Sequence, residues 1–153
     1  MDVKRIASAI ASKYGTHNPF EIADLRGINV LDCPMKSTLG YYTMYHRIQN
    51  IIISCNLPDA LRPFVCAHEL GHAICHAGLN TQWLKANTLV STDRIEREAS
   101  TFAVELLLPD GMVMEMPGIP AHEMAQIAGI PEALIQLKRF NQKPPRCKPA
   151  KGR

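Results

Sequence analysis

Residues 59–77 read Asp-Ala-Leu-Arg-Pro-Phe-Val-Cys-Ala-His-Glu-Leu-Gly-His-Ala-Ile-Cys-His-Ala, and this stretch carries the information that decides the fold. Asp59 is of a residue type that caps helix N-termini, and Pro63 falls in the first turn, where a missing N–H costs least. Gly78 follows the last apolar residue, as at many helix ends. The stretch therefore predicts a helix from about Asp59 to Ala77, with an apolar face that anchors it in the core.

The same helix carries the pattern His-Glu-x-x-His at His68, Glu69 and His72. Histidines four residues apart lie on one helix face, so their rings can converge on one metal ion. Zinc accepts imidazole nitrogen and, in catalytic sites, takes three protein ligands and a water molecule. Glu69 lies about 100° around the helix from His68, where it can reach that water as a general base. The alternative is a helix with two solvated histidines and no metal.

A third ligand is expected from the helix predicted between Asp93 and Leu108, which offers Glu96, Glu98 and Glu105. Glu96 and Glu98 flank the apolar stripe of this helix on opposite sides, so periodicity favours neither. Glu105 follows Glu98 by seven residues and is interpreted either as a hydrogen-bond partner of a zinc ligand or as solvated helix surface. The stripe itself is formed by Ile95, Ala99, Phe102 and Leu106.

The rest of the chain predicts an α+β domain over residues 1–140. Helical periodicity or capping signals predict helices at Asp2–Tyr14 and from Asn18 to Arg26, and two short C-terminal helices at Ala121–Ala128 and Pro131–Phe140 within a helical segment from about 117 to 140. Residues 78–92 read as irregular. Residues rich in β-branched and aromatic side chains predict strands at Ile28–Leu31, Leu39–His46 and Asn50–Cys55, the last two as a hairpin in a small antiparallel sheet.

An oxyanion formed during hydrolysis needs a hydrogen-bond donor nearby. His76 lies one turn beyond His72 on the same face and either serves this role or lines the cleft. Tyr41, Tyr42, Tyr45 and His46 on the expected hairpin are further candidates for that donor, although packing is the simpler role for most of them. The sequence does not choose among these residues.

The net charge of +3 raises the question of nucleic-acid binding. Five of the 17 basic residues lie in positions 141–153, a Pro-rich segment without acidic residues that we expect to be a disordered tail. Positions 1–140 hold twelve basic and 14 acidic residues, a net charge of about −2. Direct nucleic-acid binding is therefore not expected, since DNA-binding domains are typically basic.

Composition also bears on location. No apolar run approaches the roughly 20 residues of a membrane span, and charged residues interrupt the N-terminal segment, so neither a membrane anchor nor a signal peptide is expected. The five cysteines are odd in number and form no CxxC pair. Reduced thiols in the cytoplasm are the better interpretation.

Two motifs follow one another along the chain. The first is Ala67-His68-Glu69-Leu70-Gly71-His72, and the second joins Glu96-Arg97-Glu98-Ala99 to Phe102-Ala103 and Leu106-Leu107-Leu108-Pro109, with Asn18-Pro19-Phe20-Glu21-Ile22-Ala23 upstream. In this order the motifs resemble the ImmA/IrrE family of zinc metallopeptidases, which phages and mobile elements often encode. The resemblance runs from about Ile6 to Pro109. It implies a zincin-like fold, with zinc held by His68, His72 and Glu98, the glutamate directly before Ala-x-x-Phe-Ala.

The resemblance also implies a substrate, because members of this family cleave or inactivate helix-turn-helix transcriptional repressors. The expected function is thus that of a zinc-dependent endopeptidase acting on the repressor of a phage or mobile element, with Glu69 as catalytic base. The alternative is a non-catalytic regulatory protein that contains zinc and binds the repressor or DNA. Oligomeric state cannot be inferred from the sequence.

Overall fold

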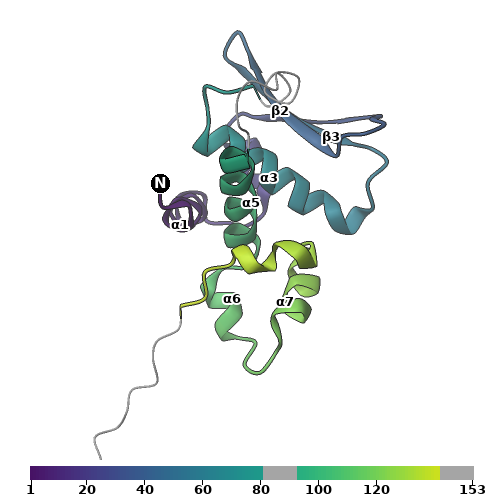
Figure 1. Cartoon of the computed structure of the whole chain (residues 1–153). Helices are drawn as coiled ribbons and strands as arrows, with labels where there is room; N and C mark the ends of the chain where they lie inside the picture. The colour runs from purple at the N-terminus through teal and green to yellow at the C-terminus, as the bar shows by residue number, and fades with distance from the viewer. Residues whose placement is uncertain (81–92, 142–153) are drawn as a thin grey trace, which may run out of the picture.

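The structure, a computed structural model, describes residues 1–80 and 93–141. A three-stranded sheet lies across one end of the molecule, and helix α3 (Arg62–Cys75) packs beneath it (Figure 1). Helix α5 (Asp93–Leu107) crosses α3 and runs away from the sheet towards the C-terminal helices. The expected α+β fold is confirmed. The irregular segment expected at 78–92 lies outside the described residues from position 81 onward, as does the tail after Asn141.

The sheet is mixed rather than antiparallel. Strands β2 (Gly40–Tyr45) and β3 (Ile48–Ser54) form the expected antiparallel hairpin, whereas β1 (Asn29–Cys33) pairs with β3 in parallel. The strand order is β1-β3-β2, so β3 is central. Its apolar run Ile51–Ile53 is buried, and a central strand needs a neighbour on each edge. Strand β2 of the hairpin pairs with one edge of β3, and β1 pairs with the other edge.

Helix α3 begins later than the capping signal predicts. Residues Asp59–Leu61 form a 3₁₀ turn, η1, and the α-helix starts at Arg62, so Asp59 is not its N-cap. Pro63 lies in the first turn as expected, since its missing N–H has no intrahelical partner there. The helix ends at Cys75, two residues before the expected end.

The N-terminal helices follow the sequence prediction closely. Helix α1 (Val3–Tyr14) is capped by Asp2, whose carboxylate accepts a hydrogen bond from the Arg5 N–H at 3.2 Å. Helix α2 (Pro19–Leu25) is capped by Asn18, whose side chain accepts from the Phe20 N–H at 3.0 Å. Helix α1 packs against α5 and completes the core on that side.

The C-terminal region departs from the prediction in two places. A short helix, α6 (Asp110–Met114), follows α5 where the sequence analysis predicts no helix or strand. Helix α7 (Ala121–Ala128) is confirmed, but the segment after it is a 3₁₀ helix, η2 (Glu132–Leu137), instead of an α-helix to Phe140. These elements lie at the far end of α5 from the sheet (Figure 1), and η2 packs on α5.

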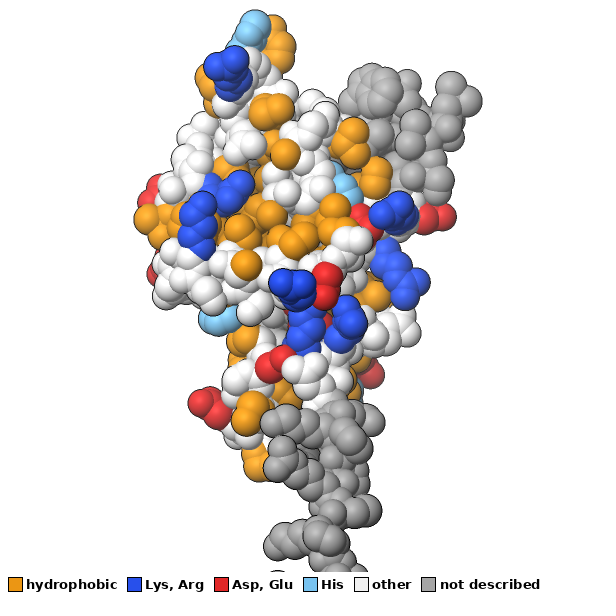
Figure 2. Space-filling view, turned by 90° about the vertical axis from the view of Figure 1, so that its left-hand side faces the viewer, with side chains coloured by type: hydrophobic (Ala, Val, Ile, Leu, Met, Phe, Trp, Pro, Cys, Tyr) orange, Lys and Arg blue, Asp and Glu red, His pale blue; other side chains and the backbone are white. Residues whose placement is uncertain are grey.

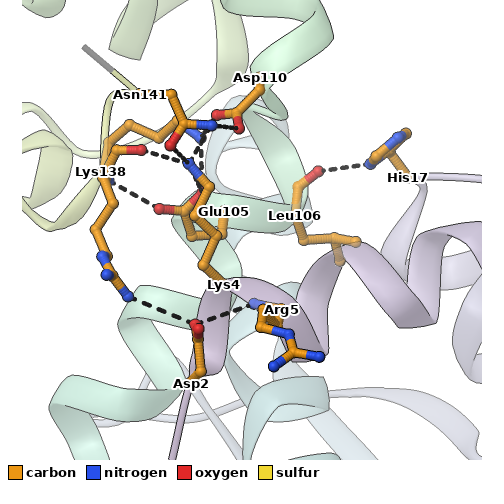
Figure 3. A network of polar contacts seen from close by, with 10 residues as sticks. Asp2, Lys4, Arg5, His17, Glu105, Leu106, Asp110, Lys138 and Asn141 are labelled. Carbon is orange, nitrogen blue, oxygen red and sulfur yellow. Dashed lines mark hydrogen bonds and ion pairs between the residues drawn. The ribbon is translucent and has the colours of Figure 1, made fainter. Parts of the chain in front are cut away.

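A network of charges with a buried pair, Lys138 and Glu105, at its centre joins α1 and the segment after η2 to α5; we call it the lysine clamp (Lys4, Glu105, Asp110, Lys138 and Arg139) (Figure 3). The Lys138 ammonium is fully buried and donates to Glu105 at 2.6 Å and to Asp110 at 2.8 Å. The Arg139 N–H donates to the other Glu105 oxygen at 2.8 Å. Glu105 therefore neither contacts a candidate ligand nor lies on the solvated surface, so both sequence interpretations of it are wrong.

Lys4 adds the N-terminal helix to the lysine clamp. Its ammonium donates to Asp110 at 2.9 Å and also to the Arg139 carbonyl (Figure 3). A buried charge is costly unless it is paired and hydrogen-bonded, and here each is. The lysine clamp thus fixes α1, α6 and the segment after η2 on the last turns of α5.

Candidate metal centre

Helices α3 and α5 bring three potential ligands together where they cross: His68, His72 and Glu96. The Nε2 atoms of the two histidines are 3.2 Å apart. One Glu96 oxygen lies 3.1 Å from His68 Nε2, and the other lies 3.4 Å from His72 Nε2. Among the described residues, this is the group of histidine, cysteine and carboxylate ligands that could hold a metal ion.

The spacing of these atoms fits a tetrahedral zinc ion. Two ligand atoms about 2.0–2.1 Å from such an ion are about 3.3 Å from each other. The histidine nitrogens are 3.2 Å apart, and each has a different Glu96 oxygen at 3.1 or 3.4 Å, so the observed separations lie close to this value. Two imidazoles and one carboxylate also form a ligand set that zinc uses in catalytic sites. The residues present therefore fit a zinc ion without rearrangement of the helices.

The structure does not bring Glu98 to this cluster. One Glu98 oxygen lies 3.1 Å from His76 Nε2, and the other accepts from Arg94 at 3.0 Å. The ligand set implied by the resemblance thus differs from the arrangement in the structure, where Glu96 takes the third position. Periodicity had left both glutamates open.

A close helix crossing explains why Glu96 faces the histidines. A Cβ atom added to Gly71 would lie 3.0 Å from the Ala99 carbonyl oxygen and 3.1 Å from Phe102 Cβ, so a side chain there would push α3 and α5 apart by a few tenths of an ångström. Ala99 is consequently fixed at the crossing point. Glu96 precedes Ala99 by three residues and shares its helix face, whereas Glu98 is rotated by about 100°.

Ser100 is a site residue that the sequence analysis missed. Its hydroxyl lies 3.1 Å from His68 Nδ1. The other ring nitrogen, Nε2, is the candidate metal-ligating atom of His68. A hydrogen bond at Nδ1 fixes the tautomer and orientation of a ligating imidazole. The available signal was its spacing, because Ser100 follows Glu96 by four residues and therefore lies on the same face of α5.

Burial and hydrogen bonding shift the pKa of Glu96 in opposite directions. Burial raises its pKa, but the hydrogen bonds and charges of His68 and His72 outweigh this effect and hold the pKa well below its usual range. Glu96 is therefore an ionised carboxylate near neutral pH, as a metal ligand must be.

The cluster opens into a cleft of about 400 Å³. Glu69 lines this cleft beside His68, and it is 2% exposed. Gly40, at the start of β2, forms part of the opposite wall; a Cβ there would lie 2.8 Å from Val65 Cγ1 and 2.9 Å from the Ile52 carbonyl oxygen. This glycine lets the sheet approach α3 closely and keeps the cleft narrow beside Glu69.

The candidates for the oxyanion donor are placed differently. None of the four hairpin candidates is among the described residues that line the cleft. Tyr42 is fully buried and accepts a hydrogen bond from Gln49 at 3.1 Å, so it is a core residue. Tyr45 is 73% exposed and stacks edge-on against His46. Burial lowers the pKa of His76, and the nearby charge of Glu98 partly counters this effect. The role of His76 as an oxyanion donor stays a prediction.

Comparison with known proteins identifies the family. A family model described as the IrrE N-terminal-like domain, a peptidase family, matches residues 23–131. The chain belongs to this family. It is 33% identical over 127 residues to the metallopeptidase ImmA of Bacillus subtilis (strain 168), covering 82% of this chain and 75% of that protein. The expected ImmA/IrrE membership is confirmed, and the chain is a metallopeptidase.

The chain is also similar to a phage protein and to a solved structure. It is 40% identical over 143 residues to immunity region protein 2 of Bacillus phage phi105, covering 92% of this chain and 90% of that protein. A solved structure described as a Mycobacterium tuberculosis transcriptional regulator superposes with a TM-score of 0.63 at 16% identity. It shares the fold with 94% of this chain, which spans 48% of that longer protein.

Two observations concern membrane-spanning helices and surface charge. In the described residues, no helix combines the length and the apolar character that crossing a membrane requires. On the face drawn in Figure 2, Lys and Arg side chains lie among Asp and Glu side chains at the middle of the molecule and form no continuous basic stripe there. In the lysine clamp, Lys4, Lys138 and Arg139 are each paired with a carboxylate.

Proposed function

We propose that the chain is a zinc-dependent endopeptidase whose metal ligands are His68, His72 and Glu96. The observation that carries this proposal is the convergence of two imidazole nitrogens and a carboxylate to within 3.4 Å of one another beside Glu69. When bound, zinc supplies Lewis acidity, which lowers the pKa of a water molecule and polarises a peptide carbonyl.

Glu69 is the catalytic residue of the proposed reaction. Its carboxylate accepts a proton from the attacking water and then donates that proton to the amine released when the C–N bond breaks. Its place in the narrow cleft, one residue from His68, suits both transfers. Ser100 supports the reaction from outside by holding the His68 ring in a fixed orientation.

The proposed substrate is a helix-turn-helix repressor of a phage or mobile element, acted on in the cytoplasm. The resemblance to the ImmA/IrrE family implies this substrate, and the similarity to a phage immunity region protein is in keeping with it. The protein would thereby regulate transcription by removing a repressor instead of binding DNA.

The test is the Glu69→Gln variant, incubated with the purified helix-turn-helix repressor encoded nearest to this gene. The variant should bind one zinc ion per chain, measured by metal analysis, because all three ligands remain. Cleavage of the repressor, followed by mass spectrometry, should fall by roughly 10²–10⁴-fold relative to the unchanged protein.

The outcome also separates the non-catalytic alternative. If the zinc-loaded Glu69→Gln protein inactivates the repressor as well as the unchanged protein does, without cutting it, binding rather than hydrolysis is the function. A control variant, Glu21→Gln, removes a carboxylate on the exposed side of α2 and should leave cleavage unchanged.

A further inference from the structure

The cleft at the metal centre is one half of a longer groove. A second hollow, of about 450 Å³, lies between α5 and η2. Glu96, Ser100 and Leu134 line both hollows and so form their common boundary. A single groove therefore passes across the candidate metal centre, and a polypeptide bound there has contacts on both sides of Glu96.

The two ends of this groove differ in chemistry. The end beneath the sheet is lined by the apolar side chains of Leu39, Phe64 and Val65. The end beneath η2 is lined by Arg97, Gln136 and Leu137. The first end suits a hydrophobic side chain, whereas the second offers a cation and an amide.

Arg97 is the charged group at the polar end that is free to bind a ligand. Within the described residues, which include every Asp and Glu of the chain, no side-chain carboxylate lies within ion-pair distance of its guanidinium. The neighbouring arginine, Arg94, differs because it pairs with Glu98 at 3.0 Å. Glu96, the acidic residue of this end, faces the two histidines. The end is thus electrostatically complementary to a carboxylate.

The wall above Arg97 is held firmly. Segment η2 supplies Leu134, Gln136 and Leu137, and Lys138 follows directly. The buried ammonium of Lys138 and the Arg139 N–H both donate to Glu105 on α5. The lysine clamp therefore fixes the position of η2 over the same helix that carries Arg97, so this end of the groove is preformed.

We propose that the polar end of the groove is a substrate subsite in which Arg97 binds an acidic side chain of an extended peptide. The peptide places a hydrophobic residue at the apolar end, on the other side of the bond over the metal centre. This inference names the substrate class for the proposed endopeptidase and rests on that function, but the binding itself requires no hydrolysis.

The experiment measures peptide binding to zinc-loaded protein that carries Glu69→Gln and so cannot cut its ligand. A library of displayed random peptides is selected on this protein, and bound sequences are counted against the unselected library. We expect Asp and Glu to be enriched at one fixed distance from a hydrophobic position. Adding Arg97→Glu should replace that enrichment by Lys and Arg, and Arg97→Ala should abolish it.

The matched control is Arg5→Glu, which makes the same change of charge on an exposed face of α1 away from the groove. It should leave the selected sequences unchanged. For single peptides differing only in Glu or Lys at the selected position, the unchanged arginine should prefer Glu by roughly two- to fivefold, the range for one partly exposed ion pair.

Two results overturn the proposal: no enrichment of acidic residues on the Glu69→Gln protein, or acidic enrichment that survives Arg97→Glu. Failure of the proposed function looks different. In that case the unchanged protein cuts none of the selected peptides, although Arg97 still determines which of them bind.

Discussion

Helix α5 carries two glutamates, nine residues apart, whose partners differ in kind. Glu105 is buried and Glu96 is half-buried. Glu105 accepts hydrogen bonds from the Lys138 ammonium and the Arg139 N–H, and its charge is neutralised within the protein. Glu96 faces two imidazole nitrogens that lie only 3.2 Å from each other. The same residue type on one helix thus contributes to a closed ion pair at one end and to an open ligand set at the other.

The contrast shows what makes a carboxylate a candidate ligand. Lys138 and the Arg139 N–H each donate to a different oxygen of Glu105, so this buried carboxylate is paired within the protein and the lysine clamp stabilises the fold. Two histidines so close together cannot both donate to Glu96 and to each other, whereas a cation between the three groups would use all their lone pairs. The following predictions test this difference.

The largest effect on stability is expected from Lys138→Met. Removing the ammonium leaves Glu105 buried without its main partner, which costs about 3–5 kcal/mol of unfolding free energy, measured by urea denaturation. Adding Glu105→Gln should recover a large part of this loss, because the amide oxygen still accepts from Arg139. Equal instability of the single and double variants would show that the charge pair is not the cause.

The second prediction concerns the third ligand. Glu96→Ala should weaken zinc binding by more than the roughly 10–100-fold typical of an indirect contact, because it removes one of three ligands. Glu98→Ala, the matched control two residues away, should retain zinc. Competition with a chelating dye measures both affinities. The opposite pattern would restore Glu98 as the ligand.

A smaller effect is expected from Ser100→Ala. Loss of the hydrogen bond to His68 Nδ1 should weaken zinc binding by about tenfold, at the lower end of the range for residues that orient a ligand. The fold should be unaffected, since Ser100 lies at the edge of the groove. Ser100→Thr, which keeps the hydroxyl, should restore affinity; if it does not, the hydrogen bond is not what positions His68.

The smallest effect concerns pH and the edge of the lysine clamp. Burial raises the pKa of Asp110, but Lys138 and Lys4 lower it by more, so the net shift is downward. A carboxyl group with a lowered pKa stabilises the fold above its unfolded pKa of about 4 and loses that contribution as the pH falls through the folded value. Asp110→Asn should therefore reduce stability at pH 7 by less than about 1 kcal/mol, as its side chain is 36% exposed. The difference from the unchanged protein should shrink as the pH falls from 7 through the folded-state pKa of Asp110.

Much of the fold could be predicted from the sequence because its signals are local. Capping by Asp2 and Asn18, the apolar stripe of α5 and the placement of Pro63 each depend on neighbours in the chain. The 3₁₀ conformation of η2 and the parallel pairing of β1 depend on distant partners and were not predicted.

The sequence by itself predicted the chemistry of the candidate site: a helix with His68 and His72 as paired candidate ligands and Glu69 beside them as candidate base. Helix periodicity is enough for that result, because all three residues lie within one turn and a half. Only the tertiary structure shows that Glu96, and not Glu98, faces the two histidines, since this depends on how α5 is rotated against α3. The contact of Gly71 with Ala99 sets this rotation, and no pattern within either helix encodes it.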